Sequence, residues 1–292
     1  MNIQAIEKQI KTYYYDFLTL LSPTLNTKVR YKAAFGKKLD LEHPKTLNEK
    51  ILWLKLNRYM NDPLIIQCSD KFRVREYVER CGYGYILNEL YHVYDSANEI
   101  RWDELPDRFV LKWNFGSGMN FLCPDKSKVT PKKAISKLRR WGRSKFWLKQ
   151  SEMQYKYIPR KILCEEFLED AGQAVIPDYK IYCFHGQPQA ILVMRDRGME
   201  TKAEFFDVNW AELDASKKYQ RPSEQTAPPE CLHEMLEAAK VLSKPFPFVR
   251  CDFYVVNGHL IFGELTFTPA GGLFLAQTNI HGVEMTEFLK IG

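Results

Sequence analysis

The spacing of hydrophobic and polar residues divides the chain into a helical first third and a longer remainder dominated by short strands. Thr46 and Glu49 have the spacing of a capping box ahead of an apolar helical run, and a second helix is predicted over residues 72–80. The aromatic and apolar side chains of residues 13–18 are expected to bury against these helices. The first third is therefore predicted to be a helical region.

The rest of the chain alternates β-rich runs with glycine-bearing loops and two helices, which are predicted at 130–142 and 229–243. The last two runs are separated by Asn257-Gly258, the strongest short-range signal for a hairpin. Strands are predicted at 108–113, 119–123, 161–168, 178–184, 189–195, 203–207, 248–256 and 259–267. This mixture predicts an α+β fold rich in antiparallel strands.

Composition limits the class of protein but does not identify a binding partner. The 292 residues, 45% of them hydrophobic, suffice for two or three packed lobes. The net charge of +6, from 42 basic and 36 acidic side chains, implies attraction to anions in general. Because the basic residues are spread along the chain and no aromatic-basic recognition motif appears, nucleic acid is not an expected partner.

Cysteine usage and the first residues bear on the cellular compartment. Seven cysteines without C-x-x-C spacing predict reduced thiols, a cytoplasmic protein and no zinc site. Residues 1–21 mix charged side chains into their apolar residues, which predicts neither a membrane span nor a cleavable signal. The amphipathic stretch 13–21 is expected to belong to the core rather than to anchor the protein in a membrane.

A first candidate for chemistry is Lys112, which lies in an apolar strand and precedes Gly116, Ser117 and Gly118. A cation and the free backbone N–H groups of a glycine loop converge there, which suits a phosphate chain. The alternative is a lysine on the solvent face of a strand, followed by an ordinary turn.

A second candidate is the strand end that contains Glu165 and Glu166. Adjacent residues of a strand point to opposite faces, so one of these carboxylates must face inward and needs a partner. The amino group or ribose hydroxyls of a nucleotide would serve, as would Lys180 in the following strand. An internal ion pair is the purely structural alternative.

The third candidate lies in the predicted hairpin, with Arg250 and Asp252 on one strand and Glu264 and Thr266 on the other. A strict two-residue loop would set Asp252 opposite Gly263 and separate the two carboxylates. A three-residue loop with a glycine bulge brings them opposite each other, and we predict this bulge. Two facing carboxylates suit Mg²⁺ with substrate phosphate oxygens, and the neighbouring arginine could neutralise a transferring phosphoryl group.

The order of these clusters resembles the ATP-grasp superfamily, of which D-alanine–D-alanine ligase is a familiar member. The shared order is a lysine with a glycine loop, a Glu-Glu-hydrophobic hinge, R-x-D, and E-x-T-x-T-P-A-G-G. Longer motifs are similar to the TupA-like ATP-grasp family, named for teichuronopeptide biosynthesis. They lie at residues 45–55, 70–71, 109–112, 178–180, 246–250 and 263–269, and the resemblance covers about residues 45–272.

The resemblance implies a role for each candidate residue around ATP and Mg²⁺. Nucleotide contacts would come from Lys71, Lys112, the closing loop Gly116, Ser117 and Gly118, the adenine hinge Glu165, Glu166, Phe167 and Leu168, and Glu169 or Asp178 at the ribose. Lys180 would contact a further phosphate, and Arg250 the acyl phosphate. Asp252 and Glu264 would hold the metal. Thr266 stands where the superfamily usually has Asn, so a second Mg²⁺ would be held more weakly or be absent. The stretch 269–272 matches the usual acceptor site.

The implied fold is an ATP-grasp core of two α+β lobes that clamp the nucleotide, with a helical N-terminal region. We expect residues 1–68 to form that region, 69–104 a linking helix and pre-core segment, 105–170 the small lobe, and 171–292 the large lobe with the metal site.

The implied reaction is ATP-dependent ligation of a carboxylate and an amine through an acyl phosphate. The setting would be bacterial surface polysaccharide assembly, in the cytoplasm or at the inner face of the membrane, in peripheral contact with membrane-bound machinery. The substrates would be an amino acid and a uronic-acid sugar or a peptide-like substituent of the glycan. A glycosyltransferase or sugar kinase of the same biosynthesis, and a non-catalytic nucleotide-binding scaffold, are the alternatives.

Overall fold

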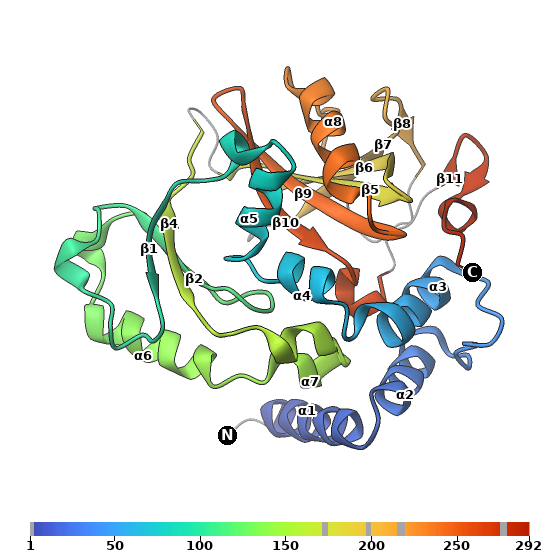
Figure 1. The fold of residues 1–292 in the computed structure, drawn as a ribbon, viewed down its shortest axis with the longest axis horizontal. Helices are drawn as coiled ribbons and strands as arrows, with labels where there is room; N and C mark the ends of the chain where they lie inside the picture. The colour runs from blue at the N-terminus through green and yellow to red at the C-terminus, as the bar shows by residue number, and fades with distance from the viewer. Residues whose placement is uncertain (1–2, 171–174, 197–199, 215–219, 275–278, 292) are drawn as a thin grey trace.

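Two antiparallel sheets form the body of the molecule, with helices between them and along one end (Figure 1). The computed structural model describes residues 3–170, 175–196, 200–214, 220–274 and 279–291. Within these ranges, no helix combines the length and hydrophobicity needed to span a bilayer. All seven cysteines carry free thiols. The α+β class predicted from the sequence is confirmed.

The first third of the chain is helical, as predicted. Its α-helices are α1 (Ile3–Leu21), α2 (Pro23–Phe35), α3 (Leu47–Leu54), α4 (Pro63–Ser69) and α5 (Val74–Arg80), with a π-helical turn, Lys55–Tyr59, after α3. The predicted capping box begins α3, where the Thr46 hydroxyl accepts from the Glu49 N–H and the Glu49 carboxylate accepts from the Thr46 N–H. Helix α5 begins later than predicted because the Asp70 carboxylate caps the preceding turn instead.

Helix α1 corrects the expectation that residues 13–18 are buried. Tyr13, Tyr14 and Phe17 are exposed, and Leu18 is the one fully buried apolar side chain among them. The helix is fixed through its more polar side, because the Thr19 hydroxyl donates to the Leu148 carbonyl of α7 (Phe146–Gln150) at 2.7 Å. The apolar side of α1 therefore faces away from the protein.

The smaller sheet has the order β1-β4-β2-β3, with β1 (Leu90–Tyr94), β4 (Ile162–Glu166), β2 (Phe109–Trp113) and β3 (Asn120–Cys123). Helix α6 (Pro131–Gly142) contributes Leu138 to the core on one face of this sheet. Strand β1 was not predicted, because its sequence lacks a regular alternation of apolar and polar residues. In the structure its side chains alternate between half-buried and exposed.

The larger sheet has the order β10-β9-β5-β6-β7-β8. Its strands are β5 (Asp178–Phe184), β6 (Gln187–Arg195), β7 (Lys202–Phe206), β8 (Glu212–Leu213), β9 (Phe248–Val256) and β10 (His259–Thr266), and a separate pair is formed by β11 (Asn279–Ile280) and β12 (Val283–Glu284). Helix α8 (Leu232–Ser243) covers one face, where the Cys251 thiol lies 3.9 Å from the Ala239 carbonyl. Because strand neighbours alternate, Arg250 and Asp252 project from the opposite face.

The β9–β10 hairpin brings the two predicted carboxylates opposite each other, but by a different route from the predicted loop bulge. Asn257 and Gly258 form a strict two-residue turn with φ of 50° and 79°. The extra residue is Gly263, within β10, which shifts the register so that Glu264 pairs with Asp252. A Cβ at Gly263 would lie 2.8 Å from the Asp252 carbonyl oxygen, so glycine suits this position.

Candidate active site

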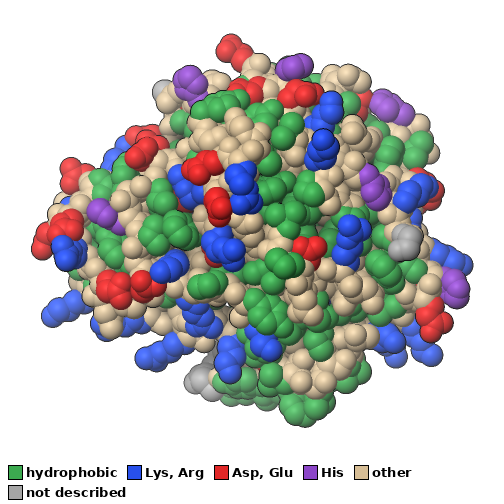
Figure 2. Space-filling model, viewed as in Figure 1, with side chains coloured by type: hydrophobic (Ala, Val, Ile, Leu, Met, Phe, Trp, Pro, Cys, Tyr) green, Lys and Arg blue, Asp and Glu red, His purple; other side chains and the backbone are tan. Residues whose placement is uncertain are grey.

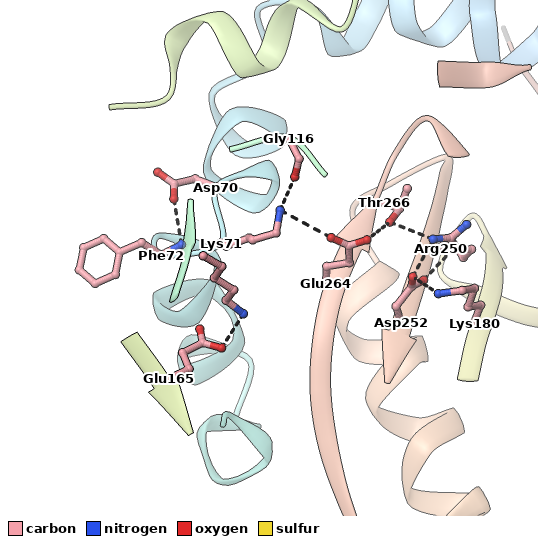
Figure 3. Close-up of polar contacts among 11 residues, drawn as sticks. Asp70, Lys71, Phe72, Gly116, Glu165, Lys180, Arg250, Asp252, Glu264 and Thr266 are labelled. Carbon is pink, nitrogen blue, oxygen red and sulfur yellow. Dashed lines mark hydrogen bonds and ion pairs between the residues drawn. The ribbon is translucent and has the colours of Figure 1, made fainter. Parts of the chain in front are cut away.

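Asp252 is the centre of a buried cluster of charges on the large sheet. Its carboxylate accepts from Arg250 Nε and Nη2, both at 2.6 Å, and from Lys180 Nζ of the adjacent strand at 2.8 Å (Figure 3). Burial raises the Asp252 pKa, but the positive charges of Arg250 and Lys180 outweigh it and leave the pKa below its usual value. The aspartate is therefore ionised at neutral pH and holds the two cations in place.

Glu264 and Thr266 complete the oxygen-rich side of this cluster. The Thr266 hydroxyl donates to Glu264 Oε1 and accepts from Arg250 Nη2, both at 3.3 Å. The described residues contain no group of three or more His, Cys, Asp or Glu side chains placed to hold a metal. The set of Asp252, Glu264 and Thr266 nevertheless fits Mg²⁺, which takes one or two carboxylates and completes its shell with water and phosphate oxygens.

Lys71 connects this cluster to the glycine loop of the smaller sheet. Its ammonium group donates to the Gly116 carbonyl at 2.5 Å and lies 3.7 Å from Glu264 Oε2 (Figure 3). Burial lowers the Lys71 pKa, and the negative charge of Glu264 opposes that shift. One cation thus contacts both the loop after β2 and the metal-ligand candidate on β10.

Sequence reasoning missed the residue that positions Lys71. The side-chain amide of Asn114 is buried and donates to Asp70 Oδ1 at 2.8 Å, while its backbone carbonyl accepts from the Lys71 N–H at 2.9 Å. Asn114 directly follows β2, so it ties the lysine to the start of the glycine loop. The one sequence signal that could have singled out Asn114 is that a polar residue stands between Trp113 and Phe115.

The predicted glycine loop is present between β2 and β3. Gly116 and Gly118 have positive φ values of 66° and 75°. A Cβ on Gly116 would lie 2.6 Å from the Phe146 ring, whereas Ser117 and Gly118 are exposed. The loop is therefore anchored at its first glycine and accessible at its tip.

Glu165 is the inward-facing member of the glutamate pair, and Glu166 is exposed. Its carboxylate pairs with Lys112 Nζ at 2.5 Å, because Glu165 lies opposite Val110 and shares a face of the sheet with Lys112. The internal ion pair is thus the arrangement observed, with Lys112 rather than Lys180 as the partner. Lys112 and Lys71 lie close enough that the charge of Lys112 lowers the Lys71 pKa.

The segment predicted as the adenine hinge lines a cavity of about 550 Å³ beside the β9–β10 turn. Phe167 and Leu168 supply apolar surface, and Glu166 and Glu169 supply carboxylates. Glu169 pairs with Arg108, whose guanidinium lies 5.1 Å from the centre of the Phe167 ring. The other lining residues are Tyr85, Glu234 and residues 256–261.

Asp178, the second candidate for the ribose, occupies a different environment. It is buried at the start of β5, 3.5 Å from Lys180 Nζ, and the hydroxyl of Tyr254 is hydrogen-bonded to it. Burial and the charge of Asp178 raise the Tyr254 pKa well above its usual value, so the phenol stays protonated. Asp178 therefore belongs to the Lys180–Asp252 cluster and not to the hinge cavity.

The glycine-rich stretch after β10 is held by residues of the N-terminal helices that sequence reasoning did not single out. Asn48 Nδ2 donates to the Gly272 and Phe274 carbonyls at 3.0 and 2.9 Å. Lys55 Nζ donates to the Gly271 carbonyl at 3.2 Å and to the Gln150 carbonyl at 2.9 Å. Residues of the motif at 45–55 therefore hold the backbone of the glycine-rich stretch after β10 in place.

The same corner of the site contains two buried charged side chains, Lys55 and Glu152, and the phenol of Tyr155. Burial lowers the Lys55 pKa to about 8, against the opposing charge of Glu152, which accepts from the Thr268 hydroxyl at 2.6 Å. Burial and the charges of Glu152 and Glu264 raise the Tyr155 pKa well above its usual value. The phenol of Tyr155 thus responds to the charge of the metal-ligand candidate Glu264, an interaction that the sequence did not indicate.

Among solved structures, the chain is similar to D-alanine–D-alanine ligase from Bacillus anthracis complexed with ATP, at 14% identity and a TM-score of 0.41, over 69% of this chain and 55% of that one. L-amino acid ligase from Bacillus licheniformis matches at 13% identity and a TM-score of 0.46, over 76% and 49% of the two chains. The chain therefore spans about half the length of these enzymes. No curated protein sequence matches it.

The family model described as TupA-like ATPgrasp matches residues 49–280. That range contains every candidate residue from Lys71 to Thr266, and the predicted ATP-grasp fold with a helical N-terminal region is confirmed. The order of motifs along the chain, the facing carboxylates on β9 and β10, and the match over most of the sequence agree. The chain belongs to the TupA-like ATP-grasp family.

Proposed function

We propose that this protein is an ATP-dependent carboxylate–amine ligase that acts through an acyl phosphate. The observation that carries the proposal is the convergence of four lysine and arginine side chains with two facing carboxylates. Lys71 and Lys112 come from the side of the smaller sheet, and Lys180 and Arg250 from the larger sheet, where Asp252 and Glu264 face each other. Such a constellation matches the charge of a nucleotide triphosphate and its metal.

The nucleotide would lie between the two sheets, with its base against Phe167 and Leu168 in the hinge cavity. Of the two candidates for the ribose hydroxyls, Glu169 is favoured because it lines that cavity and is exposed, whereas Asp178 is buried against Lys180. Glu165 and Lys112 are paired with each other, so a bound nucleotide would offer both of them polar partners at the hinge.

Phosphate binding would exchange partners within the charge cluster. Lys71 and Lys180 would turn from Glu264 and Asp252 toward phosphate oxygens, with the exposed Ser117 and Gly118 closing over them. Asp252, Glu264 and Thr266 would then hold Mg²⁺, which supplies neutralisation of phosphate charge during transfer. Each buried charge keeps an opposite partner before and after this exchange, as low-dielectric surroundings require.

In the reaction we propose, a substrate carboxylate oxygen attacks the γ-phosphorus and ADP leaves. The amine of the second substrate then attacks the acyl carbon, and phosphate leaves as the amide forms. Arg250, held by Asp252 beside Thr266, would stabilise the acyl phosphate. The acceptor would be positioned by the loop at 269–272, whose backbone is fixed by Asn48 and Lys55.

The substrates we propose are an amino acid and a uronic-acid sugar or peptide-like substituent of a bacterial surface polysaccharide. This rests on membership of the TupA-like family. The enzyme would work in the cytoplasm or at the inner face of the membrane, beside the polysaccharide machinery. We also propose that the small lobe extends N-terminally from 105–170 to include β1, since that strand pairs with β4.

Calorimetric titration with ATP, with and without Mg²⁺, tests the nucleotide site. We expect magnesium-dependent binding that is lost in Lys112→Ala and Asp252→Ala and retained in Arg80→Ala, whose ion pair with Glu76 is exposed. Mixtures of uronic acids and amino acids would then be screened for ADP release and amide formation. An absence of ATP binding by the natural chain would refute the ligase proposal. A stable phosphorylated product without amide would indicate a kinase instead.

A further inference from the structure

Helix α1 presents a continuous apolar stripe to solvent. Its side chains are between 50% and 64% exposed and recur every three or four residues along one side of the helix. They are Ile10, Tyr13, Tyr14, Phe17, Leu20 and Leu21, here called the α1 stripe. A contiguous exposed stripe of this kind, unlike scattered apolar side chains, marks an interaction surface.

The orientation of α1 is fixed by the opposite side of the helix, so rotation does not relieve the exposure. The Thr19 hydroxyl bonds to the Leu148 carbonyl at 2.7 Å and lies 2.9 Å from the Ser151 hydroxyl. The Tyr15 carbonyl accepts from Asn26 Nδ2 of α2 at 2.7 Å. The α1 stripe is thus held outward by polar contacts to α7 and α2.

Positive charge is concentrated around this stripe. Residues 1–38 contain seven basic and two acidic side chains, a net charge of +5. Residues 143–160, which include the helix α7 that packs on α1, contain five basic side chains and one acidic side chain, the buried Glu152, for a net charge of +4. Because the whole chain carries +6, the remaining residues carry a net charge of −3.

Several of these basic side chains are exposed on the elements next to α1. They include Lys28 and Lys32 of α2, and Lys145, Lys149 and Lys156 at and after α7. Figure 2 shows hydrophobic side chains gathered along the edge where Figure 1 places α1, with Lys and Arg side chains beside and above them. Two copies of this surface would bring like charges together, whereas an anionic surface would neutralise them.

We infer that the α1 stripe is a membrane-binding surface that lies in the headgroup region of an anionic phospholipid bilayer. The helix would lie parallel to the bilayer with its aromatic and aliphatic side chains inserted. The lysines of α2 and α7 would contact lipid phosphates within the range over which charges act at physiological salt. This surface is separate from the nucleotide site, and the inference does not depend on the ligase reaction.

Co-sedimentation of the full chain with vesicles tests the inference. We expect binding to vesicles of phosphatidylcholine mixed with phosphatidylglycerol, and little binding to phosphatidylcholine alone. The triple variant Ile10→Ser, Phe17→Ser, Leu20→Ser should weaken partitioning by about tenfold or more, because the inserted apolar area is removed. Lys28→Ala and Lys32→Ala should each weaken it roughly fivefold, with the effect diminishing as salt is raised.

Leu122→Ser is the matched control, since Leu122 is 61% exposed on β3 and lies outside the α1 stripe. It should leave vesicle binding unchanged. Thermal unfolding of the triple variant checks that its fold is intact, as expected when exposed side chains are replaced. The vesicle assay needs no nucleotide, so failure of the ligase proposal would leave its result interpretable.

Three outcomes would overturn the inference. The first is an absence of partitioning to anionic vesicles by the natural chain. The second is partitioning that the triple variant retains in full. The third is a concentration-dependent dimer in sedimentation velocity that the triple variant abolishes, which would assign the α1 stripe to a second copy of the chain.

Discussion

Replacing Lys180 by Met tests whether the charge cluster at the centre of the site is held together as described. Lys180 Nζ lies 2.8 Å from Asp252 Oδ2 and 3.5 Å from Asp178 Oδ2, and all three side chains are buried. The methionine keeps a similar volume but removes the cation. The buried carboxylates of Asp178 and Asp252 then have one positive charge fewer beside them.

The expected loss of unfolding free energy depends on which partners Asp252 keeps in the Lys180→Met variant. Removing one partner of a buried ion pair costs about 3–5 kcal/mol of unfolding free energy. Arg250 keeps its two hydrogen bonds to Asp252, so we expect the lower end, about 3 kcal/mol. Neutralising Asp178 as well, in Asp178→Asn with Lys180→Met, should recover about 1 kcal/mol or more of that loss.

Urea unfolding followed by circular dichroism at neutral pH measures these differences. The slope with denaturant should be unchanged, so the shift in midpoint reports stability directly. Arg80→Met is the control, because the Arg80–Glu76 pair is exposed and should contribute less than about 1 kcal/mol. If Lys180→Met loses less than about 1 kcal/mol, or if the double variant is less stable than the single one, Lys180 does not balance the buried carboxylates.

Two further predictions concern the bulge and the buried lysine near the glycine-rich loop. Gly263→Ala places a Cβ 2.8 Å from the Asp252 carbonyl oxygen and should weaken magnesium-dependent ATP binding in calorimetry. Gly36→Ala is the control, because Gly36 follows α2 and a Cβ there meets no atom within 4 Å, so ATP binding should stay intact. Equal effects of the two variants on ATP binding would contradict a role for the bulge. Since burial lowers the Lys55 pKa from 10.5 to about 8, the unfolded chain holds more protons between these values, and stability should rise with pH there. By about pH 9 the gain in unfolding free energy amounts to roughly 1.4 kcal/mol. Urea titrations at about pH 7 and pH 9 should show this gain in the natural chain and not in Lys55→Met. An equal change in unfolding free energy between the two pH values in both proteins would refute the prediction.

Local sequence signals predicted most of the fold and much of the site. The capping box at Thr46, the Asn257-Gly258 turn and the eight predicted strands follow from short-range propensities. Each is present in the structure, the strands with limits that differ from the prediction by up to two residues. The pairing of Asp252 with Glu264 was predicted because two facing carboxylates suit Mg²⁺, and the register of β9 and β10 places the two residues opposite each other. The position of the bulge was wrong, since the sequence does not show that Gly263 approaches the neighbouring backbone.

Features that depend on distant contacts could not be read from the sequence. Asn114 becomes important through Asp70, which is 44 residues away. The charge of Glu264 acts on Tyr155 because of the path of a short 3₁₀ segment, Met153–Tyr157, that has no periodic pattern. The exposed side of α1 was predicted to be buried because hydrophobicity alone does not reveal that Thr19 fixes the opposite side.

The contacts that Asn48 and Lys55 make with the glycine-rich loop bear on how relatives could diverge. Asn48 bonds to a carbonyl 224 residues further along the chain, so the beginning of the chain supports its end. A chimaera that received only α3 and its π-helical turn from a relative would reshape the loop at 269–272 while leaving the lysines and carboxylates of the nucleotide site untouched. Under the proposed function, acceptor preference would then be open to change through substitutions in an N-terminal helix, without any change to the residues proposed to bind phosphate.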